Sequence, residues 1–377
     1  MRKICILATN HNAHQVRVYH RICLSLVEDG YQVDLVAQER GTREFVDGVH
    51  FYQVGEHRPT IEIRPLERLQ RVRQAFSIAL QSNADIFQFH SPEFISRAIA
   101  LRKQTGKPVI FDCMEDFDSY IQQRPGIPWW LRPFLTRYIR RELRRAGSSL
   151  DAIMTADRGT RDYFLPWARR LLVLHNLPVL RAFPDMLEES YPIYDLVYHG
   201  GLSRYYLRMM LKIDDALKGR GRLVKWYLFG NMPERDWFLA ELTKRQAKER
   251  FCIGERVPHD QIIGQVRKAR IGIIPLPDLP KYHNNIPQKL FEYMALRMPV
   301  VMSDLPPSRP FVGDGACALM VKPDDPNAYA DAIIRLLDNP SLCRLMGAEG
   351  RSRVEREYNW EKESRKLLVL YEELLGS

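Results

Sequence analysis

The sequence predicts an α/β protein of two domains, each built on a parallel, doubly wound sheet. Short strand-like runs rich in β-branched and aromatic residues alternate with longer helix-like segments along both halves of the chain. The chain has 377 residues, enough for two domains that each bury a core. A Pro-rich stretch from 175 to 192 separates the halves and is typical of a linker. Strands that alternate with helices at this spacing favour parallel pairing.

The N-terminal half alternates from its first residues onward. Strands are expected at 3–9, 32–37, 50–54, 86–90, 108–112, 152–155 and 171–174. Helices are expected near 16–28, 66–81, 94–103 and 133–145. The loop that follows the first strand lacks a Gly-x-Gly-x-x-Gly turn, so we do not expect a dinucleotide site there.

The C-terminal half repeats the alternation. Strands are expected at 196–199, 224–229, 251–253, 271–275, 300–303 and 318–321. Helices are expected near 207–216, 237–248, 261–269, 287–297 and 328–337, with a last amphipathic helix at 359–375. Two such sheets leave a cleft between them, and ligands of parallel sheets bind beyond the carboxyl ends of the strands. The loops after the strands therefore hold the candidate site residues.

The composition argues against several classes of protein. The six cysteines are scattered, with no Cys-x-x-Cys pair, so we expect neither a metal nor a redox site. No apolar run approaches the ~20 residues needed to cross a bilayer, and the apolar run after Met1 is too short for a signal peptide. We expect a cytoplasmic protein. The net charge of +10 suggests a nucleic-acid binder. Basic and aromatic residues interleave only at 129–145, however, so we expect no nucleic acid as a partner.

The stretch from 283 to 304 is the most informative part of the chain, because it predicts a polar loop, a capped helix and a buried strand in that order. Asn284 and Asn285 are favourable N-cap residues, and Pro287 suits the first helical turn. Glu292 falls nearly opposite the apolar arc of this helix. Amides at the helix start suit a phosphate, and the carboxylate suits a sugar diol. The alternative is an ordinary amphipathic helix with a solvated Glu.

The run from Asn284 to Ala295 reads Asn-Asn-Ile-Pro-Gln-Lys-Leu-Phe-Glu-Tyr-Met-Ala, and it resembles the donor-binding segment of the family-4 glycosyltransferases of GT-B fold. The resemblance covers nearly the whole chain. It implies two Rossmann-like domains that face a cleft, 1–178 for the acceptor and 179–357 for a nucleotide-sugar donor, and a helix at 358–377 that returns to the N-terminal domain. In the family, one Glu of a pair lies near the transferred sugar and the other on the nucleotide ribose. Glu292 matches the second Glu, whereas Asn284 stands where the first would be.

The resemblance also assigns residues of the N-terminal domain. His90 ends an expected strand and matches a His near the transferred sugar, where it could hydrogen-bond substrate or move a proton. Glu115 follows the next strand and is expected in the catalytic site with His90 and Asn284, while Asp112 is interpreted as a loop-capping carboxylate. His11, His14 and Arg17 follow the first strand and are expected to contact the acceptor; a surface Arg at a helix start is the alternative for Arg17.

The donor side is expected to use glycine turns and the 283–304 helix. Glycine lets backbone N–H groups approach a diphosphate. The family commonly follows the first turn with an Arg and a Lys, whose positions hold Gly201 and Tyr206 here, so Arg204, Arg208 or Lys289 must supply the charge. The expected donor-binding residues are Gly200, Gly201, Arg204, Gly230, Asn231, Arg256, Val257, Asn285, Ile286, Pro287, Lys289 and Glu292.

These residues lead us to expect a retaining glycosyltransferase that moves a sugar from a nucleotide-diphosphate sugar to a glycan, lipid-linked or small-molecule acceptor. It is expected to need no cofactor. We identify no metal-binding Asp-x-Asp in the sequence and therefore expect catalysis that needs no divalent ion. A nucleotide-sugar epimerase of the same fold and a catalytically weakened nucleotide-sugar binding module are the alternatives.

The segment 129–145 carries six Arg and one Glu among aromatic and aliphatic residues, with two Trp at its start. A basic amphipathic helix of this kind lies on an anionic membrane surface or solvates one face of a domain. The first interpretation places the protein peripherally at the inner membrane face, where a lipid-linked acceptor would be found.

Overall fold

A computed structural model describes residues 1–38, 45–55, 65–123, 126–184, 192–258 and 261–376. Contacts divide the chain into unit 1, Met1–Asn176 with Glu361–Ser377, and unit 2, Leu177–Trp360. From the sequence, we expect the domain boundaries after residue 178 and before residue 358. Each unit is described by itself.

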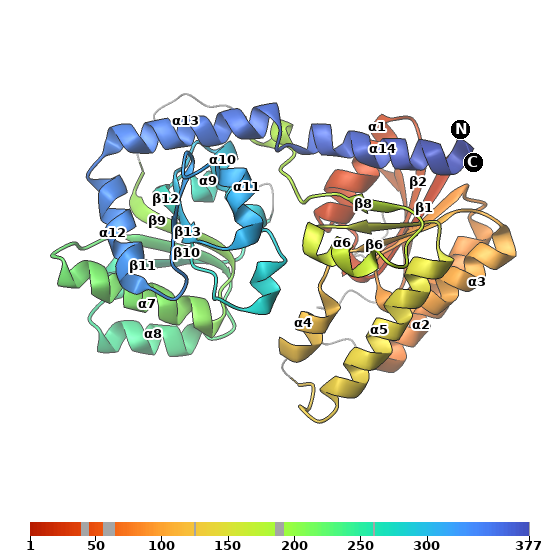
Figure 1. Cartoon of the computed structure of the whole chain (residues 1–377), viewed down its shortest axis with the longest axis horizontal. Helices are drawn as coiled ribbons and strands as arrows, with labels where there is room; N and C mark the ends of the chain where they lie inside the picture. The colour runs from red at the N-terminus through yellow and green to blue at the C-terminus, as the bar shows by residue number, and fades with distance from the viewer. Residues whose placement is uncertain (39–44, 56–64, 124–125, 185–191, 259–260, 377) are drawn as a thin grey trace. The chain divides into compact units, whose positions relative to one another are not determined.

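Unit 1 is built on an eight-stranded sheet in the order β3-β4-β2-β1-β5-β6-β7-β8 (Figure 1). All pairs described are parallel except β3 with β4. The strands are β1 (Lys3–Asn12), β2 (Gln32–Gln38), β3 (Phe45–Val46), β4 (Val49–Gln53), β5 (Ile86–Phe89), β6 (Val109–Cys113), β7 (Ala152–Thr155) and β8 (Leu171–Val173). The sequence missed β3, because two residues are too short to show alternation.

The helices of unit 1 cover this sheet, and α2, α3 and α5 pack side by side (Figure 1). They are η1 (Arg17–Cys23), α1 (Leu24–Glu28), α2 (Pro65–Gln81), η2 (Pro92–Phe94), α3 (Ile95–Thr105), α4 (Phe117–Gln123), α5 (Arg132–Ser149), α6 (Arg158–Phe164) and α14 (Trp360–Gly376). The sequence missed α4 and α6, whose seven residues give too few turns for a helical period. The described part of the chain contains no helix both long and apolar enough to cross a membrane.

The expected first helix of unit 1 is π-helical at its start. In η1 the Arg21 amide donates to the Val16 carbonyl at 3.1 Å, one residue further back than in an α-helix. The wider turn carries Arg17 and Arg21, which are 2% and 1% exposed and lie inside the unit. Short π-helical segments are frequent at functional sites.

Unit 2 is built on a six-stranded sheet in the order β11-β10-β9-β12-β13-β14, with every described pair parallel. Its strands are β9 (Tyr194–Gly201), β10 (Trp226–Asn231), β11 (Phe251–Gly254), β12 (Ala269–Ile274), β13 (Val300–Ser303) and β14 (Ala318–Val321). Large apolar residues, among them the fully buried Trp226 and Tyr293, fill its core.

Among the helices of unit 2, α7 packs against α12 and α10 packs against α13 (Figure 1). The helices are η3 (Leu180–Ala182), α7 (Arg204–Gly219), α8 (Arg235–Lys244), η4 (Lys248–Arg250), α9 (Ile262–Val266), η6 (Pro280–His283), α10 (Gln288–Ala295), η7 (Pro306–Ser308), α11 (Arg309–Val312), α12 (Pro326–Leu337) and α13 (Pro340–Arg356). The sequence did not predict α13, which begins at Pro340 and whose Leu342 amide donates to the side chain of the N-cap residue Asn339.

The expected cap of α10 was wrong. Pro287 occupies the N-cap position with an extended backbone, and no side chain caps the helix. Asn284 instead follows the short helix η6. The helix ends at Ala295, two residues before the expected end, because the chain turns at Arg297, whose φ is 56°. The first turn of α10 therefore begins without a side-chain acceptor for its amides.

Candidate functional site

Two glycines meet where β9 and β10 end in unit 2. Gly200 and Gly230 are paired in register, with φ of 112° and 129°, values that favour glycine. A Cβ on Gly230 would lie 2.2 Å from the Gly200 carbonyl oxygen, so no other residue fits at 230. A Cβ on Gly201 would meet nothing within 4 Å. The turn thus exposes backbone at the carboxyl end of the sheet, where a phosphate could approach it.

Lys289 of α10 supplies a cation at this glycine turn. Its ammonium lies 3.6 Å from the point that a Cβ of Gly200 would occupy. It also lies 3.4 Å from the Tyr198 hydroxyl and 4.5 Å from the centre of that ring. A cation over the face of an aromatic ring is held in place without losing its charge. Of the three cations considered from the sequence, Lys289 is the one shown beside the glycines.

Arg204 and Arg208 are held elsewhere on unit 2. The Arg204 guanidinium lies 3.3 Å from a carboxylate oxygen of Glu234 and 4.6 Å from the Trp237 ring centre. Arg208 lies over the same ring at 5.6 Å. The two Arg side chains thus contact the same Trp237 ring.

Glu292 is buried, so the alternative interpretation as a solvated Glu was wrong. It is 4% exposed; one carboxylate oxygen accepts from the Gln288 amide at 2.9 Å and the other lies 3.1 Å from His199 Nε2. The His199 ring stacks on Phe229, with centroids 5.5 Å apart. The sequence missed His199, although its place directly before the two glycines of β9 was a usable signal.

The other expected donor residues lie in loops at or near strand ends. Asn285 is partly buried, and its side-chain oxygen makes no hydrogen bond within the described residues. Arg256 is exposed and Val257 packs partly against the core, both in the loop after β11. Asn231 ends β10, where its carbonyl accepts from the Leu202 amide at 2.8 Å. Ile286 and Pro287 are partly buried before α10.

Arg17 forms a buried ion pair in unit 1, so the interpretation as a surface Arg was wrong. Its guanidinium donates to both carboxylate oxygens of Asp112 at 2.8 Å. It also donates to the Leu174 carbonyl at 2.7 Å and to Asn176 at 2.9 Å. These bonds join the start of η1 to the ends of β6 and β8. Removing one partner of such a pair leaves a buried charge and typically costs about 3–5 kcal/mol.

Asp112 links this Arg to the expected catalytic His, so the interpretation as a loop cap was also wrong. Burial alone would raise the pKa of the Asp112 carboxyl, but the charge of Arg17 and hydrogen bonds from His90 and Arg17 outweigh it and hold the pKa below its usual range. His90 Nδ1 lies 3.2 Å from one of its oxygens. Asp112 is therefore a fixed anion beside the imidazole.

The second nitrogen of His90 faces Gln88. Gln88 Nε2 lies 3.2 Å from His90 Nε2, and the Gln88 carbonyl oxygen accepts from the Tyr371 hydroxyl of α14. Because the Gln88 amide nitrogen can only donate, His90 Nε2 accepts its proton. The imidazole proton is therefore assigned to Nδ1, on the side of Asp112. The His90 side chain is 0% exposed, with Gln88 beside one ring nitrogen and an Asp112 oxygen 3.2 Å from the other.

His11 lies next to this network, at the end of β1. Its ring meets that of His90 edge-on with centroids 6.3 Å apart. Burial and the neighbouring His90 lower the pKa of His11 to about 4, against the opposing effect of Asp112. His11 is therefore neutral at pH 7. His14 is exposed, and its ring packs edge-on against Tyr19 at 4.9 Å.

An Asp-x-Asp tripeptide does occur after β6, at Asp116-Phe117-Asp118, beside the exposed Glu115. Asp116 accepts from the amides of Asp118 and Ser119 at 3.1 and 3.2 Å, so it caps α4. Asp118 pairs with Arg140 at 2.7 Å. Both carboxylates thus have structural partners, and we assign no metal to them.

Two family models match the chain, one for each unit. The model "Glycosyltransferase Family 4" matches residues 15–180, and the model "Glycosyl transferases group 1" matches residues 194–339. The chain belongs to the family-4 glycosyltransferases.

Curated relatives of this family-4 member are similar over part of their length. An alpha-D-kanosaminyltransferase of Streptomyces kanamyceticus is 24% identical over 42% of this chain and 40% of its own length. A phosphatidyl-myo-inositol mannosyltransferase of Mycobacterium leprae is 36% identical over 23% of each chain. The matched part of this chain therefore spans less than half of the length of either relative.

A solved structure is similar over the full length of this chain. Sucrose-phosphate synthase of Thermosynechococcus elongatus gives a TM-score of 0.77 at 17% identity, with all of both chains covered. The expected GT-B fold, with a parallel sheet in each domain, is confirmed.

Proposed function

We propose that this family-4 member is a retaining, metal-independent glycosyltransferase whose unit 2 binds a nucleoside diphosphate sugar. The observation that carries the proposal is the Lys289 ammonium placed beside the paired glycines of β9 and β10. A glycine turn offers amides to phosphate oxygens, and the cation neutralises their charge. The first turn of α10, which no side chain caps, adds amides and the positive end of the helix dipole.

Glu292 is proposed to hold the ribose of the nucleotide. One of its oxygens accepts from Gln288, the other lies beside His199, and a carboxylate oxygen can accept more than one hydrogen bond. A carboxylate fixed in this way suits the two hydroxyl groups of a diol. Burial makes these bonds selective, since an unpaired group here would carry a desolvation cost.

Transfer from such a donor depends on the leaving diphosphate. Negative charge grows on its oxygens as the glycosidic bond breaks, and a fixed cation stabilises that state more than the ground state. Lys289 is the residue we propose for this role. Asn284 is proposed to contact the transferred sugar through its amide, and the retaining outcome is proposed from the family resemblance.

Unit 1 is proposed to supply His90 and Glu115 to the catalytic site and His11 and His14 to the acceptor. With the assigned proton on Nδ1, His90 Nε2 is the nitrogen left to exchange its Gln88 contact for a substrate hydroxyl. Arg17 then acts on the acceptor side indirectly, by holding Asp112 beside the imidazole.

The acceptor is proposed to be lipid-linked, reached from an anionic membrane at the inner face. A groove of about 1240 Å³ runs along α5, lined by Arg137, Arg140, Arg141, Arg144 and Arg145 with aromatic residues. Trp129 and Trp130, just before α5, are 79% and 59% exposed. Basic and aromatic residues together suit a headgroup layer, and one relative is named for transfer to phosphatidyl-myo-inositol.

Calorimetry of the full chain with UDP, GDP and ADP tests the donor site, followed by transfer assays with the sugar donors of the nucleotide that binds. Binding of one diphosphate below millimolar concentration and transfer without added divalent ion are expected. No binding of any of the three would refute the donor proposal. Binding without turnover would favour the binding module, and isomerised free sugar would favour an epimerase.

A further inference from the structure

Two neighbouring residues of β9, Tyr198 and His199, each lie against a charged side chain of α10. They directly precede the glycines at the end of the strand, and both are buried, with 1% and 6% of their surface exposed. Tyr198 lies beside Lys289, and His199 lies beside Glu292. Lys289 and Glu292 are the residues that we propose for the diphosphate and the ribose. One strand end therefore contacts both charges of the proposed donor site.

The Tyr198 hydroxyl joins the glycine turn to Lys289. It donates to the Gly201 carbonyl at 3.1 Å and accepts from the Lys289 ammonium at 3.4 Å. An ammonium has three N–H donors, so this contact leaves donors for phosphate oxygens. A long side chain that is already held in place loses less conformational entropy when a ligand binds. Tyr198 thus keeps Lys289 beside the turn before a diphosphate binds.

His199 is placed to orient the Glu292 carboxylate. Its ring stacks on Phe229 at 5.5 Å and meets Tyr293 edge-on at 5.4 Å. In this orientation His199 Nε2 lies 3.1 Å from Glu292 Oε2, and it makes no hydrogen bond to another group among the described residues. An ionised carboxylate only accepts, so we assign the ring proton to Nε2, where it attracts that oxygen. Gln288 donates to the other oxygen at 2.9 Å, so the carboxylate is contacted from two sides.

We propose that Tyr198 and His199 are positioning residues of the donor site. Tyr198 holds Lys289 for the diphosphate. His199 orients Glu292 for the ribose diol, because two hydroxyl groups can bind one carboxylate together only when its plane faces both. The inference rests on the proposed nucleotide-sugar site of unit 2. The two residues act through different charges, so their effects should separate by ligand, whereas a purely structural role would weaken binding of every ligand alike.

Calorimetry of the full chain with three ligands separates the two roles. The ligands are the diphosphate that binds among UDP, GDP and ADP, its parent nucleoside, which has no phosphate, and its 2′,3′-dideoxy analogue, which has no diol. Tyr198→Phe keeps the ring beside Lys289 and removes the hydroxyl. Its affinity for both diphosphates should fall about 3- to 10-fold, with that for the nucleoside unchanged. Tyr227→Phe is the matched control on the neighbouring strand β10, where the hydroxyl donates to Gln265 at 2.7 Å, and it should change none of the three affinities.

Two amide variants test His199. The amide of His199→Gln can take the place of Nε2, whereas the shorter side chain of His199→Asn does not reach Glu292. In His199→Asn, affinity for the two ligands with a diol should fall about 3- to 10-fold, with that for the dideoxy diphosphate unchanged. His199→Gln should lose less. Equal losses in the two variants would show that the N–H beside Glu292 does not orient it and would overturn the role of His199.

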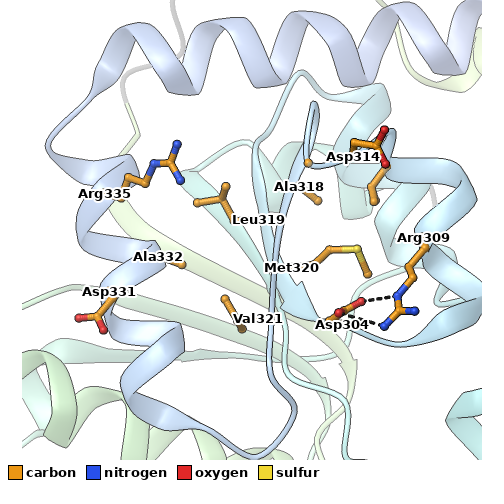
Figure 2. Close-up of a pocket in the computed structure, with 12 residues that line it drawn as sticks. Asp304, Arg309, Asp314, Ala318, Leu319, Met320, Val321, Asp331, Ala332 and Arg335 are labelled. Carbon is orange, nitrogen blue, oxygen red and sulfur yellow. Dashed lines mark hydrogen bonds and ion pairs between the residues drawn. The ribbon is translucent and has the colours of Figure 1, made fainter.

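The groove beside β14 provides a control for diphosphate binding elsewhere on unit 2. It has a volume of about 570 Å³, and Arg309 and Arg335 are among the residues that line it (Figure 2). The lining also includes Asp304, Asp314 and Asp331. Arg309 pairs with Asp304 at 2.7 Å, and the other carboxylates should repel a diphosphate. Arg335→Gln should therefore leave all three affinities unchanged. A larger loss in Arg335→Gln than in Tyr198→Phe would place the diphosphate in this groove and overturn the inference.

The same measurements distinguish failure of this inference from failure of the donor site. A wild-type protein that binds none of the three diphosphates would overturn the donor site, and this inference with it. Wild-type binding with unchanged affinities in Tyr198→Phe and His199→Asn would overturn the inference alone. Equal losses for all three ligands in either variant, in a protein whose circular dichroism matches wild type, would do the same, since they indicate a structural role.

Discussion

Replacing Lys289 with Gln tests the donor site most directly. Gln retains much of the side-chain length and removes the charge that lies 3.6 Å from the Gly200 position. A hydrogen bond to a charged group contributes about 1.5–3 kcal/mol, so affinity for a nucleoside diphosphate should fall roughly 10- to 150-fold. The loss should shrink at high salt, because part of it is screened Coulomb attraction.

Calorimetry with the bound diphosphate and with its parent nucleoside measures the effect. The nucleoside carries no phosphate, so its affinity should be the same for Lys289→Gln and wild type. Arg204→Gln is the matched control, since it removes a cation of unit 2 that is held by Glu234 and Trp237. Its diphosphate affinity should change less than threefold, about 0.6 kcal/mol.

An equal loss of affinity for the nucleoside and the diphosphate would mean that Lys289 maintains the structure of the site and does not bind the phosphates. An unchanged diphosphate affinity would refute the reasoning altogether. A larger loss in Arg204→Gln than in Lys289→Gln would move the phosphate site toward Trp237.

Four further predictions concern the remaining site residues and the α5 groove. Glu292→Ala should weaken nucleotide binding by about 1.5–3 kcal/mol in the same calorimetric assay, and an unchanged affinity would remove the ribose role. His90→Ala should spare nucleotide affinity and lower turnover in a steady-state transfer assay; loss of both would indicate misfolding. Folding lowers the pKa of His11 from 6.5 to about 4, so the unfolded chain binds more protons than the folded chain between these two pH values. The free energy of unfolding should therefore decrease as the pH falls from 6.5 to 4. Urea unfolding of His11→Gln should show a smaller decrease over that range. The double variant Arg137→Gln and Arg141→Gln removes two exposed cations that make no ion pair among the described residues, so sedimentation with anionic liposomes should fall, whereas neutral liposomes should bind neither protein.

The sheet strands could be predicted from sequence because parallel strands buried on both faces are continuous apolar runs. β7, β13 and β14 begin and end at the predicted residues. Most helices longer than two turns were also found, with α13 the exception, while α4 and α6 were too short to show a period. Local pattern thus determined the layers of each unit but not their short connections.

The site was harder to predict, because pairing of buried charges depends on residues far apart in sequence. Arg17 and Asp112 are 95 residues apart. From sequence, Arg17 appears as an acceptor contact or a surface cation and Asp112 as a loop cap, yet the two are paired and both are buried. His199 and Glu292 are also distant in sequence. The amphipathic period of α10 places Glu292 on a polar face, but His199 of β9 lies against that carboxylate in the structure. A polar residue on a helix can face a buried partner as well as water.

Tyr206 bears on the departure from the family pattern that first suggested a weakened enzyme. It stands where the family commonly has a diphosphate cation, and its hydroxyl donates to the Tyr282 hydroxyl at 2.7 Å. Tyr282 lies in η6, which leads through Asn284 and Asn285 to α10. Tyr206 thus links α7 to the segment before α10. It has a structural role at a position where the family commonly has a cation. Lys289 of α10 carries a positive charge instead. In the proposed site the cation therefore comes from α10 and not from position 206.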